Sequence, residues 1–196
     1  MTERLTQIPY EALPADIRPM ADYILSISSA GLGGPYNALL RSPVMAQRTL
    51  DLLDYLRFNT SVPKRLNEFA ILIQARISNA QYEWWAHERI ARKAGLSDHV
   101  MAALRECRRP EGMQDDEALV YDFCTQLSLN HRVSQDLWDR AVQSMGEQQV
   151  IDLVVLSGTY VMVSMLLNAT QVGIPHNEPE PLTVMSPQAI HQSLLA

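Results

Sequence analysis

Apolar residues recur at helical spacing in one segment of this sequence after another, and residues that start or stop helices separate the segments. Ser42-Pro43 offers an N-cap followed by proline at the first helical position, and Gly95 suits the left-handed residue that ends a helix. No long stretch alternates apolar and polar residues as a half-buried strand would. The sequence therefore predicts an all-α protein.

Helices are expected over residues 14–29, 43–58, 63–77, 80–94, 97–108, 114–129, 134–145 and 147–172. Residues 31–37 are rich in glycine and other turn formers and are expected to form a loop, and Ser78-Asn79 is expected to be a bend. Prolines recur after Gly173 and predict an extended tail, apart from a turn near residues 188–194.

The length of 196 residues suits one domain with a sizeable core. We divide the chain into an N-terminal helical extension (1–30), a helical domain (31–175) and a Pro-rich tail (176–196). The net charge of −6 argues against a nucleic-acid partner, because phosphate binding needs a concentrated basic face.

The location in the cell is predicted from the cysteines and the N-terminus. Met1 to Tyr10 lacks the basic-then-apolar pattern of an export signal, and a chain with only Cys107 and Cys124 is typical of a cytoplasmic protein with reduced thiols. Residues 150–172 are strongly apolar, but polar residues such as Asp152 interrupt them. We therefore expect a helix buried in a core or a subunit interface, and no membrane span.

Three side chains between Asn67 and Glu88 have the spacing of an acid–base site. Glu83 and His87 are four positions apart and share one face of a helix. If the chain reverses at Ser78-Asn79, Glu68 lies level with His87 on the neighbouring helix. Two carboxyl groups and an imidazole then meet, which suits proton transfer. Spacing alone equally allows an exposed Glu83–His87 pair and a solvated Glu68.

The segment NEFAILIQARISNAQYEWWAHERIARKAGLS (residues 67–97) resembles the carboxymuconolactone decarboxylase family, which shares its fold with alkyl hydroperoxidase D. Two further segments are similar to that family, SGTYVMVSMLLNATQVGIP (157–175) and GGPYNALLRSP (33–43). The resemblance covers roughly residues 31–175. It implies a single-domain helical bundle of the alkyl hydroperoxidase D-like type.

The peroxidase branch of this family has a motif that begins with a glutamate and ends with a histidine. Two cysteines lie between them: eleven residues separate the glutamate from the first cysteine, two separate the cysteines, and three separate the second cysteine from the histidine. Here Glu68 and His87 occupy the outer positions, but Ala80 and Glu83 stand where the thiols would be. A thiol peroxidase needs those thiolates. The resemblance therefore favours the decarboxylase branch over a peroxidase.

That branch implies a lyase, or an isomerase, that uses no metal or organic cofactor and acts on a small carboxylated or lactone-like compound in aromatic compound catabolism. The resemblance implies His87 as the proton donor or shuttle, Glu68 as its orienting partner and Glu83 as a second acid–base group. The candidate substrate-binding residues are Tyr36, Asn37, Arg41, Arg76, Tyr82, Trp84 and Trp85, with Arg41 or Arg76 as the carboxylate binder.

Family members form trimers or hexamers, so the resemblance also implies a homo-oligomer. The apolar surface of residues 147–172 favours the same expectation. Three alternatives stay open at this point: a peroxidase-related protein without the paired thiols, a metal enzyme that uses Glu68, Glu83 and His87 as ligands, and a non-catalytic oligomeric binding protein.

Overall fold

The computed structural model describes residues 3–28 and 30–195, and Met1, Thr2, Ser29 and Ala196 lie outside that description. Within the described residues the chain is helical and has no strand, which confirms the all-α prediction. The elements are η1 (Tyr10–Ala12), α1 (Arg18–Ile27), α2 (Pro35–Leu39), α3 (Pro43–Asp54), η2 (Tyr55–Asn59), α4 (Lys64–Ile77), α5 (Gln81–Lys93), α6 (Asp98–Arg105), α7 (Asp115–Asn130), α8 (Gln135–Thr170), η3 (Pro175–Asn177) and α9 (Pro187–Leu194).

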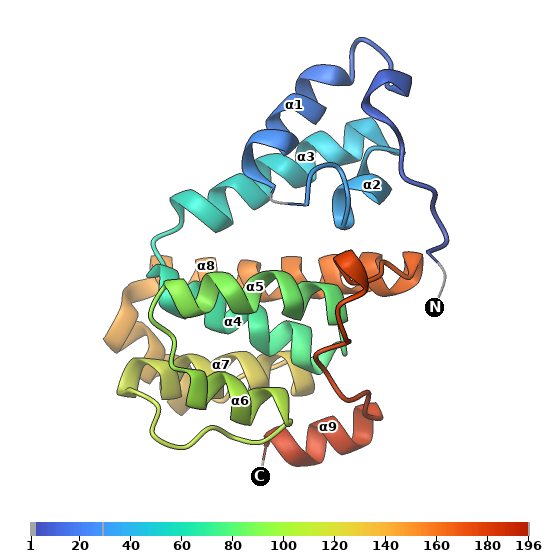
Figure 1. Cartoon of the computed structure of the whole chain (residues 1–196). Helices are drawn as coiled ribbons and strands as arrows, with labels where there is room; N and C mark the ends of the chain where they lie inside the picture. The colour runs from blue at the N-terminus through green and yellow to red at the C-terminus, as the bar shows by residue number, and fades with distance from the viewer. Residues whose placement is uncertain (1–2, 29, 196) are drawn as a thin grey trace.

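Helix α4 is the centre of the protein. Every residue from Leu66 to Arg76 is buried, because α5, α7 and α8 pack around this helix. Figure 1 shows α4, α5 and α8 in the middle of the molecule, α6, α7 and α9 on one side of them, and α1, α2 and α3 on the other. A helix buried on all sides normally carries only apolar residues. The charged residues of α4 therefore need partners inside the protein.

The buried apolar residues form two clusters. The larger lies within the α4–α8 bundle, and the smaller joins Leu13 of the N-terminal segment to residues as far along the chain as Leu50 in α3. The smaller cluster crosses the boundary that we placed after residue 30. Residues 3–28 thus pack together with α2 and α3 as one layer.

The structure differs from the expected elements at four places. Residues 31–37 do not form a loop throughout, because α2 begins at Pro35. Residues 55–59 form a π-helical turn, η2, in place of the last α-helical turn of α3. The two C-terminal helices run on as α8 across a kink at Gly146, where φ is 79° and ψ is 159°. The expected turn near residues 188–194 is the helix α9.

The tail from Gly173 lies along the bundle and is fastened to the bend between α4 and α5 (Figure 1). The side chain of Gln81 makes two hydrogen bonds to the backbone of Leu182, of 2.8 and 2.9 Å. Asn79 likewise bonds the backbone of Met185 in both directions, and Ile190 of α9 is buried in the larger cluster. The tail is extended as predicted, and it is also part of the packed structure.

Helix α8 is long and apolar enough to span a membrane if length and composition alone are considered. In this structure 56% of its most apolar window is buried against other helices. A core helix meets the same criteria, so the cytoplasmic location stays a prediction.

Asp152 of α8 fixes the segment between η2 and α4. Its carboxylate accepts hydrogen bonds from the hydroxyls of Tyr55, Thr60 and Ser61 and from the Ser61 backbone N–H, at 2.8–3.2 Å. Burial alone would raise the pKa of Asp152, but these hydrogen bonds stabilise the charged form and lower it. Asp152 therefore connects the π-helical turn to α8 through charge-assisted bonds.

We expect Asp152→Asn to lower the free energy of unfolding by about 1.5–3 kcal/mol at neutral pH, because hydrogen bonds to a buried charge are lost. Since the pKa of Asp152 is lowered by folding, the wild-type advantage is present above the ordinary pKa of 3.8 and shrinks as the pH falls below it. Urea denaturation at several pH values measures both effects. The exposed Asp16→Asn is the control, and an equal loss in both variants would contradict the assignment.

Candidate active site

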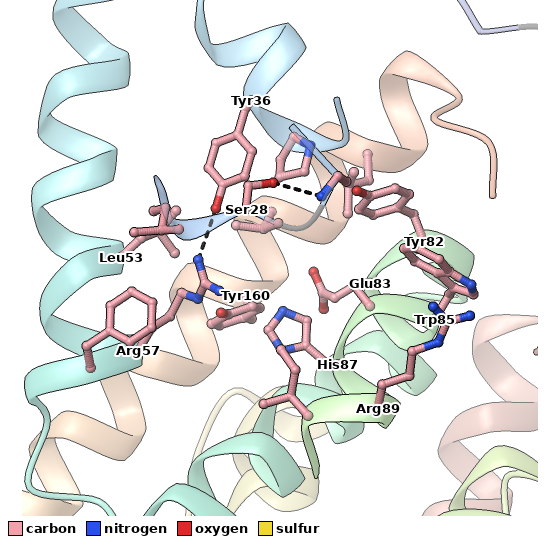
Figure 2. Close-up of a pocket in the computed structure, with 18 of the residues that line it drawn as sticks. Ser28, Tyr36, Leu53, Arg57, Tyr82, Glu83, Trp85, His87, Arg89 and Tyr160 are labelled. Carbon is pink, nitrogen blue, oxygen red and sulfur yellow. Dashed lines mark hydrogen bonds between the residues drawn. The ribbon is translucent and has the colours of Figure 1, made fainter. Parts of the chain in front are cut away.

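A pocket of about 540 Å³ lies between the layer of α1, α2 and α3 and the central bundle. Its walls are mostly apolar, with a few polar groups that converge from α2, η2, α5 and α8 (Figure 2). The polar and aromatic lining residues are Ser28, Tyr36, Arg57, Phe58, Tyr82, Glu83, Trp85, His87, Arg89, Lys93 and Tyr160. An apolar hollow with few polar groups is the usual form of a small-molecule site.

The α4–α5 hairpin brings Glu68 and His87 together, as the spacing predicted. Nδ1 of His87 lies 2.7 Å from Oε2 of Glu68. Glu68 is 0% exposed and stands behind the ring, whereas His87 is 9% exposed and lines the pocket. The Glu68 carboxylate thus orients the imidazole.

Burial alone would raise the pKa of Glu68, but the charge and hydrogen bond of His87 lower it, and so does Lys64. The Lys64 ammonium is 2.6 Å from the second carboxylate oxygen. Glu68 is therefore ionised at neutral pH and accepts a hydrogen bond from the Nδ1–H group of His87. This fixes the tautomer and leaves Nε2 as the nitrogen that exchanges protons with a ligand.

The pKa of Glu83 is shifted in the opposite direction to that of Glu68. It is 1% exposed, and one carboxyl oxygen accepts a 2.9 Å hydrogen bond from the Ser164 hydroxyl of α8. The other oxygen is buried and has no hydrogen-bond partner among the described residues. Burial raises the pKa of Glu83 well above its ordinary value, and the Ser164 bond offsets only part of that rise. The neutral acid is the favoured form of Glu83.

Tyr160 of α8 completes the inner end of the pocket. Its ring meets the His87 ring edge to face, with 5.1 Å between centroids. Burial raises the pKa of the Tyr160 phenol well above its ordinary value, so the phenol stays protonated. Figure 2 shows the Tyr160 ring, the His87 ring and the Glu83 carboxyl side by side.

Three of the seven predicted substrate-binding residues line the pocket. Tyr36 enters from α2, and Tyr82 and Trp85 enter from α5 with their rings 5.6 Å apart. Gly34 precedes Tyr36 with a φ of 61°, and a Cβ at this glycine would lie 2.5 Å from the Tyr82 hydroxyl. The close approach of α2 to α5 at this wall therefore requires glycine.

The other four predicted substrate-binding residues do not line this pocket. The Trp84 indole is fully buried in the larger cluster and donates a 3.1 Å hydrogen bond to Glu88, so it is a core residue. Arg76 lies about 12 Å along α4 from Glu68, since an α-helix rises 1.5 Å per residue. Its guanidinium donates to the backbone carbonyls of Arg105 and Thr183 and so holds the tail.

Asn37 and Arg41 bind the N-terminal segment of the chain. The Asn37 side chain bonds the backbone of Leu5 and Ile8, and Arg41 donates to the carbonyls of Asn37 and Thr6. Neither residue lines the pocket. The structure therefore does not bring Asn37 and Arg41 to the Glu68–His87 site, because both side chains bind backbone groups that no sequence pattern reveals.

Sequence reasoning missed Arg57 and Tyr160. Tyr160 comes from α8, far along the chain from the Glu68–His87 segment, and Arg57 comes from η2, the element just before α4. Tyr160 lies within the segment 157–175 that resembled the family, which was the one available signal. Arg57 had none, because its direction depends on the π-helical turn.

Neither cysteine belongs to the pocket. Cys107 and Cys124 are free and buried, as the sequence predicted, and burial raises the pKa of the Cys124 thiol to about 12. Among residues 3–28 and 30–195, no three His, Cys, Asp or Glu side chains are grouped to hold a metal ion. The arrangement offers acid–base chemistry, with a histidine, an ionised carboxylate and a neutral carboxyl group.

No protein-family model matches this sequence, and no curated protein matches it either. Its site is therefore interpreted from its own geometry and from the resemblance of its motifs.

Glu68→Gln and Glu83→Gln are expected to change stability with opposite dependence on pH. Because folding raises the pKa of Glu83, the wild-type free energy of unfolding falls relative to Glu83→Gln as the pH rises above 4.5, by about 1.4 kcal/mol per pH unit until the folded-state pKa is reached. Because folding lowers the pKa of Glu68, the wild-type advantage over Glu68→Gln, about 3 kcal/mol at neutral pH, shrinks below pH 4.5. Urea denaturation between pH 3 and pH 8 measures both, and slopes of the same sign would disprove the contrast.

Proposed function

We propose that this protein is a cofactor-independent lyase or isomerase of the carboxymuconolactone decarboxylase type, with an alkyl hydroperoxidase D-like helical fold. Its substrate is a small carboxylated or lactone-like compound. The observation that carries the proposal is the 2.7 Å contact between Glu68 and His87 at the wall of an apolar pocket that also contains the neutral acid Glu83. Such a pair of oppositely tuned carboxyl groups is typical of acid–base enzymes.

In the decarboxylase reaction the bond between the ring carbon and the substrate carboxylate breaks, and carbon dioxide leaves. The electron pair of that bond passes into the conjugated lactone carbonyl and forms a dienolate. Nε2 of His87, or the Glu83 carboxyl, then delivers a proton to carbon and restores the neutral lactone. The ionised Glu68 stabilises the imidazolium form of His87 before that transfer. Uptake of a proton from water returns the donor to its starting state.

An isomerase uses the same groups in a different order. One of the two groups removes a proton from carbon next to the carbonyl, and the other returns a proton at a different carbon. The apolar walls exclude water during either reaction, which strengthens the electrostatic effects of the buried groups. The thiols of Cys107 and Cys124 are buried, so they do not support a peroxidase reaction.

We expect His87→Ala to lower kcat/KM by about 10²–10⁴-fold on unsaturated lactone acids, because the pocket loses its proton donor. Carbon dioxide release and the ultraviolet absorbance of the conjugated lactone measure turnover and separate decarboxylation from isomerisation. Glu68→Gln is expected to cause a smaller loss, because His87 remains but is no longer oriented by a charge.

The control for this experiment is His99→Ala, which removes an exposed histidine from α6 and should leave turnover unchanged. Circular dichroism confirms that each variant is folded. Equal turnover by wild type, His87→Ala and Glu68→Gln would refute the proposed roles and favour a non-catalytic binding protein.

We also propose that the protein assembles as a homo-oligomer through one face of α3 and α8. Val44 and Met45 of α3 and Ile151, Val155 and Met165 of α8 are exposed apolar residues. Between these helices runs a shallow groove of about 680 Å³, in which Arg48 is the one charged residue among the described lining residues. Two copies of the chain can bury the same apolar surface against each other, whereas a charged partner would lose its hydration there. The surface therefore favours self-association.

Light scattering at micromolar concentration is expected to give a mass that is a multiple of 22.1 kDa, with a trimer or hexamer as the predicted state. Val44→Glu combined with Val155→Glu should reduce that mass, because two charges per chain would be buried at the interface. Val184→Glu changes an exposed valine of the tail, away from this face, and serves as the control. A monomeric wild type would contradict the proposed assembly.

A further inference from the structure

Arg57 is a charged side chain of the pocket without an ionic partner. Its Nη1 donates a 3.0 Å hydrogen bond to the Tyr36 hydroxyl, and its Nε is buried and has no hydrogen-bond partner. No carboxylate among the described residues forms an ion pair with this guanidinium. An arginine that is largely removed from water without a counter-ion is costly unless a ligand supplies the negative charge.

The surroundings of Arg57 hold it in place. The π-helical turn η2 directs the side chain into the pocket, and the neighbouring Phe58 ring lies 4.8 Å from its guanidinium carbon. Lys64 donates a hydrogen bond to the Arg57 carbonyl, and the hydrogen bonds of Asp152 anchor the residues that follow. Short π-helical turns are frequent at functional sites. The guanidinium is therefore positioned before any ligand arrives.

Most of the charged residues that line the pocket are cationic. Arg57, Arg89 and Lys93 are cationic, whereas Glu83 is the one acidic residue in the lining and favours its neutral form. Arg89 is neutralised by Glu178 of the tail, at 2.8 Å, and Lys93 is exposed. Among the described lining residues this leaves Arg57 as the inner cation without an ion pair, attracted only at longer range by the Glu68 carboxylate behind His87.

We propose that Arg57, supported by Tyr36, binds the carboxylate of an organic acid whose apolar body fills the pocket beside His87. The guanidinium presents a planar fork of N–H donors that matches a carboxylate, and one bond to Tyr36 leaves that fork available. Arg57 is thus the residue that selects acids over neutral compounds, the role that Arg41 and Arg76 do not fill. This inference rests on the proposed function in one respect, because it takes this pocket to be the substrate site.

Calorimetry with benzoate as the probe, and with benzyl alcohol as its neutral counterpart of similar size, tests the proposal. We expect wild type to bind benzoate at least about tenfold more tightly than benzyl alcohol, and Arg57→Met to lose that preference. Arg57→Lys, which keeps the charge but not the fork, should retain part of it. Tyr36→Phe should weaken benzoate binding because it removes the hydroxyl that orients Arg57.

Arg132→Met is the matched control, because it removes an exposed arginine that does not line the pocket. Its benzoate affinity should stay within about twofold of wild type. Equal benzoate affinity in wild type and folded Arg57→Met would overturn the proposal, as would the absence of benzoate binding by wild type at about 10 mM. Benzoate binding does not require turnover, so the two proposals can fail separately. A protein that binds benzoate through Arg57 but has no activity would refute only the proposed function. An active protein whose benzoate affinity is unchanged by Arg57→Met would refute only this inference.

Discussion

The ionised carboxylate of Glu68 inside α4 is the constraint on which the site depends. A charge at the centre of a helix buried on every side is tolerated only with compensating partners, and here Lys64 and His87 provide them from opposite sides. This requirement favours the observed register of α5 against α4, because another register would leave Glu68 with Lys64 of its own helix as its one charged partner. The same contact directs the free nitrogen of His87 into the pocket, so the interaction that stabilises the core also positions the acid–base group.

The sequence predicted the hairpin well because helix geometry is regular. Residues at similar distances from the bend at Ser78-Asn79 must lie level in a helical hairpin, so the spacing predicts that Glu68 lies beside His87. The all-α class followed equally directly from spacing and helix boundaries. The arginines were harder to assign, since a guanidinium binds whichever carboxylate or backbone carbonyl the tertiary structure brings to it. Arg76 and Arg41 bind carbonyls, and Arg57, which has no sequence signal, enters the pocket.

The pocket is formed jointly by two layers of the protein. One wall comes from α5 and α8, and the other comes from the segment that carries Tyr36 and Arg57. Residues 3–28 share an apolar cluster with α2 and α3, and Ser28 lines the pocket. The substrate preference therefore depends on the packing of the N-terminal layer against the bundle as much as on the residues of the hairpin.

The π-helical turn at residues 55–59 has an evolutionary consequence. A π-helical turn accommodates one more residue than the α-helix it interrupts, so deletion of a single codon there would restore regular α-helical winding. The residues after the turn would keep their places, whereas the side chains within it would be redistributed around the helix axis. A cation could in this way enter or leave the pocket in one genetic step, with the rest of the bundle unchanged. Related chains that differ by one residue in this segment would then differ in the charge of the compounds they accept.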